Sequence, residues 1–142
     1  MSYLLDTCVI SEIIRRRPHA GVVKWLENCD ESDLYLSVLT IGEIRKGIAR
    51  LEDGDRKVSI QRWLDNDLAN RFEGRILPVD VAVATTWGRM QAEAESRGES
   101  MPTVDGLLAA TAMVHNLALV TRNEKDFSHS GVRIINPWKT GG

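Results

Sequence analysis

The chain has 142 residues, 43% of them hydrophobic, which predicts one domain over residues 1–142 with its own core and no room for a second domain. No run approaches the roughly 18 apolar residues of a membrane span, and the start lacks the basic-then-apolar layout of a secretion signal, so we expect a cytoplasmic protein without a membrane partner. With 20 acidic and 18 basic residues, the net charge of −2 disfavours indiscriminate binding to nucleic acids, and any such contact requires a local basic patch.

Short apolar runs alternate with longer helical patterns along the chain. The runs are predicted strands, and in chain order they cover residues 3–5, 34–38, 75–79, 117–121 and 132–135. Helical spacing of apolar residues lies between them, over residues 9–14, 22–29, 41–51, 60–72, 83–94 and the nearly all-apolar stretch 106–114. Strands that are apolar on both faces and separated by helices indicate a mostly parallel sheet between two helical layers, an α/β/α fold.

Four carboxylates follow predicted strands or begin predicted helices. Asp6 comes directly after the first strand and is expected to cap a helix, and Glu43, three residues after Thr40, matches a capping box. Asp105 lies in the first turn of the buried helix, where a negative charge suits the helix dipole, and Asp126 follows the fourth strand in a solvated turn. Each residue taken alone has this structural explanation.

Taken together, the same four carboxylates favour a metal site. The carboxyl ends of parallel strands meet at one edge of a sheet, so these side chains are expected to converge there. Two carboxylates about 4 Å apart repel by roughly 1 kcal/mol in water and about 4 kcal/mol in a partly buried site, and a cation removes this repulsion. Oxygen ligands without Cys or His at zinc spacing favour Mg²⁺ or Mn²⁺, which suits hydrolysis of a phosphodiester bond.

The other candidate residues receive structural interpretations. Cys8 and Cys29 lack the spacing of metal ligands and are expected to be small core residues. The four tryptophans are expected to pack in the core or at an interface. A solvated helix surface is the preferred interpretation for most of the basic residues that could line an approach for a substrate backbone, namely Arg15, Arg16, Arg17, Arg45, Lys46 and Arg50.

The sequence contains four blocks in a fixed order, LLDTCVISE, SVLTIGEIRKGI, PTVDGLLAATA and LVTRNEKDF, followed by INPW. In these blocks the chain resembles the PIN-domain ribonucleases, specifically the VapC and FitB type of toxin from bacterial toxin–antitoxin pairs. The resemblance extends over almost the whole chain. It implies a three-layer α/β/α PIN-like domain with a central five-stranded parallel sheet in the order 3-2-1-4-5.

The resemblance also implies a site and an activity. Asp6, Glu43 and Asp105 would be the principal metal-binding carboxylates, with Asp126 as the fourth acidic member. The implied reaction is endonucleolytic cleavage of RNA by activated water, dependent on Mg²⁺ or Mn²⁺. Neighbouring polar side chains could orient the water, namely Thr7, Thr121 and Asn123. Family members commonly carry Asn at the position that Cys8 occupies here.

The family's partners are implied in the same way. Family members are usually homodimers that a small antitoxin holds inactive, and the complex often binds operator DNA through the antitoxin. Two other functions stay open. A phosphotransfer receiver also combines an α/β sheet with acidic residues, and Asp80 would be its phosphorylated residue. A PIN-like binding protein without catalysis is the third possibility.

Overall fold

The structure, a computed structural model, describes residues 1–140, so the last two residues of the predicted domain, 141 and 142, lie outside the described residues. Its centre is one five-stranded sheet in the order β3-β2-β1-β4-β5, in which every neighbouring pair is parallel. The strands are β1 (Tyr3–Leu5), β2 (Leu34–Ser37), β3 (Ile76–Leu77), β4 (Ala118–Val120) and β5 (Ile134–Ile135). This arrangement confirms the predicted parallel α/β fold and its strand order.

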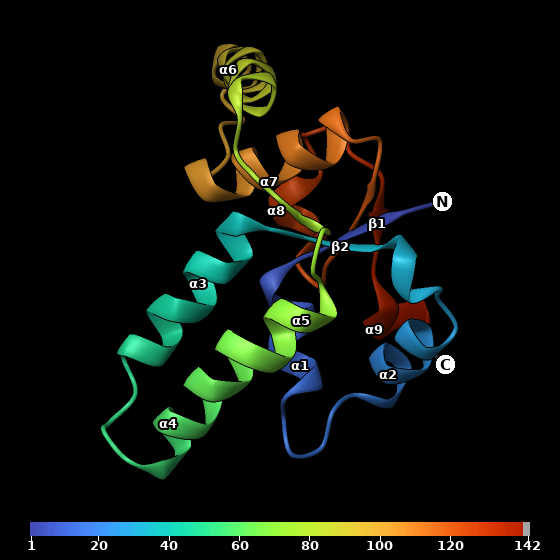
Figure 1. Ribbon diagram of the computed structural model, residues 1–142. Helices are drawn as coiled ribbons and strands as arrows, with labels where there is room; N and C mark the ends of the chain where they lie inside the picture. The colour runs from blue at the N-terminus through green and yellow to red at the C-terminus, as the bar shows by residue number, and fades with distance from the viewer. Residues whose placement is uncertain (141–142) are drawn as a thin grey trace.

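Helices cover both faces of the sheet (Figure 1). One group comprises α1 (Thr7–Ile13), α2 (Ala20–Glu27), α3 (Val38–Ala49), α4 (Asp55–Arg62), α5 (Ala69–Arg71) and α9 (Pro137–Thr140). The other comprises α6 (Val81–Ser96), α7 (Thr103–Val114) and α8 (Glu124–Phe127). Two irregular helical turns complete the elements, a 3₁₀ turn η1 (Glu31–Asp33) and a π-helical segment η2 (Trp63–Leu68).

Successive residues of the central strands point to opposite faces of the sheet and pack into two separate hydrophobic cores. Leu5 and Val120 pack with α1 to α4 and η2, whereas Leu4 and Leu119 pack with α6, α7 and α8. This alternation follows from the period of two along a strand, and it explains why the short strands are apolar on both faces. The four tryptophans are partly buried against these cores, as predicted, with Trp25, Trp63 and Trp138 on one side and Trp87 on the other.

The predicted helix 60–72 contains a π-helical segment. Its apolar residues recur every four positions, and Leu64, Leu68 and Phe72 are all at most 3% exposed. An α-helix has about 3.6 residues per turn, so residues spaced by four drift around its surface. The wider turn of η2, between α4 and α5, counteracts this drift and keeps the three side chains on the buried face.

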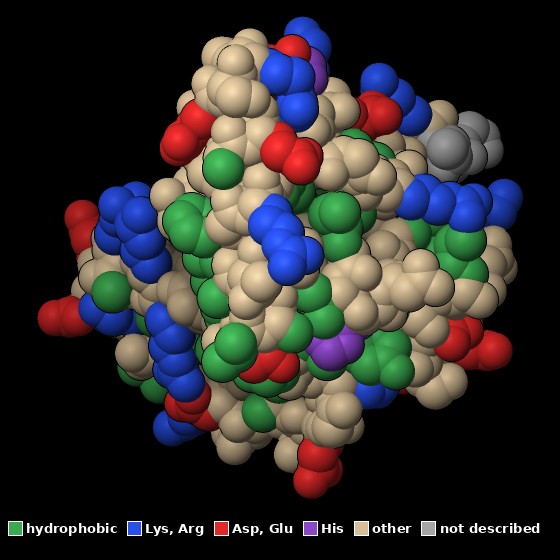
Figure 2. All heavy atoms as spheres, turned by 90° about the horizontal axis from the view of Figure 1, so that it is seen from above, with side chains coloured by type: hydrophobic (Ala, Val, Ile, Leu, Met, Phe, Trp, Pro, Cys, Tyr) green, Lys and Arg blue, Asp and Glu red, His purple; other side chains and the backbone are tan. Residues whose placement is uncertain are grey.

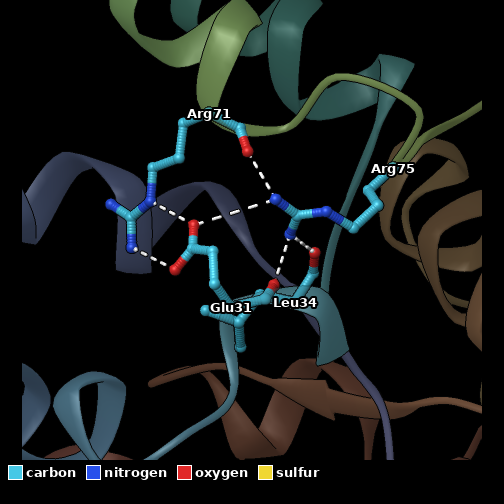
Figure 3. Close-up of polar contacts among 4 residues, drawn as sticks. All are labelled: Glu31, Leu34, Arg71 and Arg75. Atoms are coloured by element: carbon cyan, nitrogen blue, oxygen red, sulfur yellow. Dashed lines mark hydrogen bonds and ion pairs between the residues drawn. The ribbon is translucent and has the colours of Figure 1, made fainter.

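Two arginines fasten the end of this helical stretch to the start of β2 (Figure 3). The guanidinium group of Arg71 donates two hydrogen bonds to the Glu31 carboxylate, at 2.6 and 3.2 Å. Arg75 donates to the backbone carbonyls of Glu31, Leu34 and Arg71. The hydrogen bonds from Arg71 lower the pKa of Glu31 despite its partial burial. This cluster holds β2 in place at its amino end, opposite the edge where Asp6 lies.

The end of the described chain is tied to α1 through a buried carboxylate. Glu12 is 5% exposed and accepts hydrogen bonds from the indole N–H of Trp138, at 3.3 Å, and the backbone N–H of His19, at 3.2 Å. Burial alone would raise the pKa of Glu12, but these hydrogen bonds and the nearby Arg15 outweigh it and lower the pKa. Glu12 therefore joins α1, the start of α2 and α9.

The surface carries its charges in small groups. Seen from above, the face over α6 and α7 has hydrophobic side chains in its centre and separate groups of Lys and Arg interspersed with Asp and Glu (Figure 2). Among residues 1–140, no helix is both long and apolar enough to cross a membrane.

Candidate functional site

Asp6 lies where β1 ends and α1 begins, at the carboxyl edge of the sheet. It caps α1, as predicted, by accepting a hydrogen bond from the backbone N–H of Thr7 at 2.8 Å. Its other carboxylate oxygen accepts the hydroxyl of Thr121, at 2.7 Å, and contacts the thiol of Cys8 at 3.7 Å. Asp6 is only 7% exposed, so these donors fix both oxygens in a largely buried position.

Glu43 reaches the same region from α3, but without the predicted capping box. The helix begins at Val38 with Ser37 as its N-cap, because β2 ends at Ser37. Thr40 therefore lies inside the helix, fully buried, and its hydroxyl has no hydrogen-bond partner within residues 1–140. The Glu43 carboxylate instead accepts the hydroxyl of Thr7 at 2.6 Å. Thr7 thus links α1 to α3 beside Asp6.

Asp105 and Asp126 come from α7 and α8. Asp105 lies in the first turn of α7, as predicted, and Asp126 lies within the short helix α8 rather than in a simple turn. The pKa of Asp105 rises from 3.8 to about 6, first because it is partly buried and then because of the negative charges of Asp126, Asp6 and Glu43. The structure therefore brings all four predicted carboxylates into one electrostatic neighbourhood.

The three ancillary residues support the carboxylates. The hydroxyls of Thr7 and Thr121 donate to Glu43 and Asp6, so their hydrogens are engaged with carboxylate oxygens. Asn123 donates its backbone N–H to the Thr121 hydroxyl oxygen at 3.0 Å, while Asn123 itself is exposed. Thr121 is fully buried and thereby connects the loop after β4 to the carboxylate after β1.

Cys8 lies closer to the site than its sequence interpretation suggested. Both Cys8 and Cys29 are free and pack partly buried against the core, as expected. However, the Cys8 sulfur also accepts the backbone N–H of Arg122 at 3.5 Å and touches Asp6. Burial, followed by the charge of Asp6, raises the pKa of Cys8 to about 11, so the thiol stays protonated at neutral pH. Its place two residues after Asp6 in a first helical turn was the available signal.

The four carboxylates suit a hard divalent cation, both in the type of ligand atom and in charge. Carboxylate oxygens are the ligands that Mg²⁺ and Mn²⁺ prefer, and the repulsion that raises the pKa of Asp105 is relieved by a positive charge. Within the described part of the chain, no three Asp, Glu, His or Cys side chains are already gathered as a finished metal site.

Comparison with known proteins identifies the family to which this chain is similar. The PIN domain family matches residues 3–131. The chain is 39% identical to Toxin FitB of Neisseria gonorrhoeae over 135 residues, which are 95% of this chain and 97% of that protein. It is 35% identical to VapC ribonuclease Y4jK of Sinorhizobium fredii over 136 residues, 96% of this chain and 97% of that protein.

Solved structures with the same fold support the same family. The crystal structure of FitAcB from Neisseria gonorrhoeae has a TM-score of 0.92 at 39% identity, covering 96% of this chain and 99% of that chain. The structure of FitAB bound to a DNA fragment has a TM-score of 0.90 at 38% identity, covering 96% and 95% of the two chains. The predicted resemblance is confirmed, and the chain belongs to the PIN domain family.

Proposed function

We propose that this protein is an endoribonuclease that acts as the toxin of a toxin–antitoxin pair. The observation that carries the proposal is geometric: at the carboxyl edge of a parallel sheet, Thr7 donates its backbone N–H to Asp6 at 2.8 Å and its hydroxyl to Glu43 at 2.6 Å, so two of the acids lie side by side. The raised pKa of Asp105, caused by burial and then by the charges of Asp126, Asp6 and Glu43, supports it. The names of the relatives, a toxin and a VapC ribonuclease, support the same activity.

The chain's own residues have distinct parts in this proposal. Asp6, Glu43 and Asp105 would hold Mg²⁺ or Mn²⁺, with Asp126 as the fourth acid. When bound, such a cation neutralises charge on a phosphoryl oxygen and lowers the pKa of water. Other groups keep the carboxylates oriented, since Thr121 donates to Asp6 and Thr7 donates to Glu43. Charged oxygens fixed in this way need little rearrangement during the reaction.

The partners follow from the same assignment. We propose that a cognate antitoxin binds the chain, that operator DNA is bound only through this antitoxin, and that the toxin forms a homodimer in the cytoplasm. The solved complex of FitAB with a DNA fragment supports a partner protein and DNA binding by the complex, since Toxin FitB is similar to 95% of this chain.

A phosphotransfer receiver fits the structure poorly. Receivers have the strand order 2-1-3-4-5, whereas the sheet here runs β3-β2-β1-β4-β5. Asp80, the residue that the receiver hypothesis requires, is exposed and caps α6 by accepting the backbone N–H of Val83 at 3.0 Å. It is also absent from the charges that raise the pKa of Asp105.

The test is RNA cleavage with and without metal. We expect the purified protein to cut RNA in Mg²⁺ or Mn²⁺ and not with the metal chelated. Asp6→Asn should lose at least about 100-fold in rate while staying folded by circular dichroism. Asp67→Asn is the matched control, because Asp67 is an exposed carboxylate on η2, and it should cut at the normal rate. Cleavage at the normal rate by folded Asp6→Asn would contradict the assigned role of Asp6, and no cleavage with any divalent ion would favour a non-catalytic binding protein.

A further inference from the structure

One face of α3 connects the carboxylate site to two basic side chains. Glu43, Lys46 and Arg50 are spaced by three and four residues, so they lie along the same side of the helix. All three line a groove of about 590 Å³ that also includes Thr7. With a rise of about 1.5 Å per residue, Lys46 lies about 4.5 Å and Arg50 about 10.5 Å beyond Glu43 along the helix axis.

Lys46 and Arg50 carry charges that no carboxylate neutralises. Both are exposed, and within the part of the chain that the structure describes neither forms an ion pair. Two other basic residues near the site are engaged in ion pairs. Arg15 forms an ion pair with a buried carboxylate at 3.4 Å, and Arg45, on another side of α3, pairs with Asp65. The groove therefore has positive charge available for an anionic ligand.

Two glycines of α3 line this groove, so the helix backbone has no side chains at these positions. Gly42 and Gly47 both line it, and a Cβ atom added at either position would meet no atom within 4 Å. Packing within residues 1–140 thus does not require either glycine. Without side chains at these two positions, the helix backbone is open to close approach of a ligand.

A second groove on the other side of α3 has a different character. It is larger, about 950 Å³, and its walls combine apolar side chains such as Ile13 and Ile60 with the arginines Arg15, Arg16 and Arg56. These arginines come from the segment after α1 and from α4, so they do not form one row with Glu43 along a helix. The smaller groove instead has Lys46 and Arg50 in one row with Glu43 on α3, as a nucleic-acid backbone leading away from the carboxylates requires.

We propose that this face of α3 binds the phosphate backbone of the RNA strand that is cut, an inference that rests on the proposed nuclease function. The phosphate to be cleaved lies at the carboxylates, and the phosphates next along the same strand lie on Lys46 and then on Arg50. The two cations are about 6 Å apart along the helix axis. Gly42 and Gly47 let the sugar–phosphate chain rest against the helix.

Binding of a fluorescent single-stranded RNA of about 12 nucleotides and mixed sequence tests the proposal. The full 142-residue chain carries Asp105→Asn to block cleavage, and binding is measured in Mg²⁺. We expect each of the variants Lys46→Ala and Arg50→Ala to raise Kd about three- to tenfold. Each should also make binding less sensitive to salt, reducing the magnitude of the slope of the log association constant against log salt concentration by about 0.7. Lys24→Ala and Arg133→Ala are matched controls outside the groove, and we expect them to leave Kd unchanged.

Gly42→Ala separates a binding role from a structural one. The added methyl group strengthens the helix and meets no neighbouring atom, so the melting temperature should rise. The same methyl group obstructs the RNA backbone, so Kd should rise as well. Gly88→Ala, at a position in α6 that is equally free of neighbours, should raise the melting temperature without changing Kd.

Three results overturn the proposal: unchanged Kd in both cation variants, equal losses in the two controls, or no measurable binding of the RNA. Failure of the proposed function gives a different result, because binding needs no cleavage. A chain that binds RNA through Lys46 and Arg50 but never cuts it with any divalent ion contradicts the nuclease assignment and leaves the binding face intact.

Discussion

Asp105 is the carboxyl group of the site whose pKa is clearly raised. Partial burial and the charges of Asp126, Asp6 and Glu43 raise its pKa from 3.8 to about 6. A raised carboxyl pKa means that the folded protein keeps this proton at a higher pH than the unfolded chain does. The stability contributed by protonation is fully present below about pH 3.8 and is lost as the pH rises through about 6.

We expect Asp105→Asn to be more stable than the wild type above about pH 7 when metal is chelated, because the amide carries no charge. The gain should be about 1–2 kcal/mol, less than the full linkage value because Asp105 is only partly buried, and it should vanish near pH 4. Thermal unfolding at a series of pH values measures it. Mg²⁺ should raise the melting temperature of the wild type more than that of the variant. Equal stability of the two proteins at neutral pH would argue against mutual repulsion in the site.

At the scale of elements, the contact between α6 and α7 depends on the absence of a side chain at Gly106. This residue is buried in α7, directly after Asp105. A Cβ atom there would lie 2.9 Å from two ring atoms of Trp87, which is closer than packed atoms approach. The indole ring belongs to α6 and packs, partly buried, against the core. Gly106 therefore sets how closely the two helices pack.

Gly106→Ala should lower the free energy of unfolding by about 1–3 kcal/mol, because the methyl group overpacks the contact with Trp87. Urea denaturation measures the effect. Gly88→Ala in α6 is the control, since its Cβ meets no atom within 4 Å, and it should instead stabilise by about 0.4–1 kcal/mol. A Gly106→Ala variant as stable as the control would show that the two helices can separate without cost.

Most of these elements were predictable because each buries a short apolar run. The predicted strand 34–38 contains β2, and even the two-residue strands β3 and β5 lie inside the predicted ranges. The short helices α8 and α9 and the turn η1 were missed, since three or four residues are too few to show a helical period. The order of the strands came from the family resemblance, because apolar runs of similar length carry no information about their neighbours.

The site was only partly predictable for a related reason. The spacing of Thr40 and Glu43 obeys the capping-box pattern, but local spacing could not show that β2 ends at Ser37 and starts the helix earlier. Nor could it show that the Thr121 hydroxyl reaches Asp6, because 115 positions separate the two residues. That contact exists because the sheet places β4 beside β1.

At the scale of the whole molecule, Glu12 is the contact that joins the two ends of the described chain. Its carboxylate is buried and accepts the N–H groups of Trp138 and His19. Because its pKa is lowered, the stability that its charge contributes is present above the ordinary glutamate pKa of 4.5 and is lost as the pH falls further. A neutral replacement that cannot accept hydrogen bonds would leave both N–H groups without this partner.

Glu12→Ala should therefore cost about 2–4 kcal/mol of unfolding free energy, while Glu12→Gln, which keeps one acceptor oxygen, should cost clearly less. Urea denaturation at neutral pH compares the two variants. Trp138 fluorescence should also change in Glu12→Ala, because its indole N–H loses a partner. If both variants unfold with the same midpoint as the wild type, α9 does not depend on this carboxylate.

The pairing of β1 with β4 has a consequence for how such a protein is made. Thr121 is translated 115 residues after Asp6, the residue to which its hydroxyl donates. A nascent chain that ends before β4 therefore holds Asp6 with only its local donors, Thr7 and Cys8, in place. The topology of the sheet thus postpones the assembly of the site until β4 has been made.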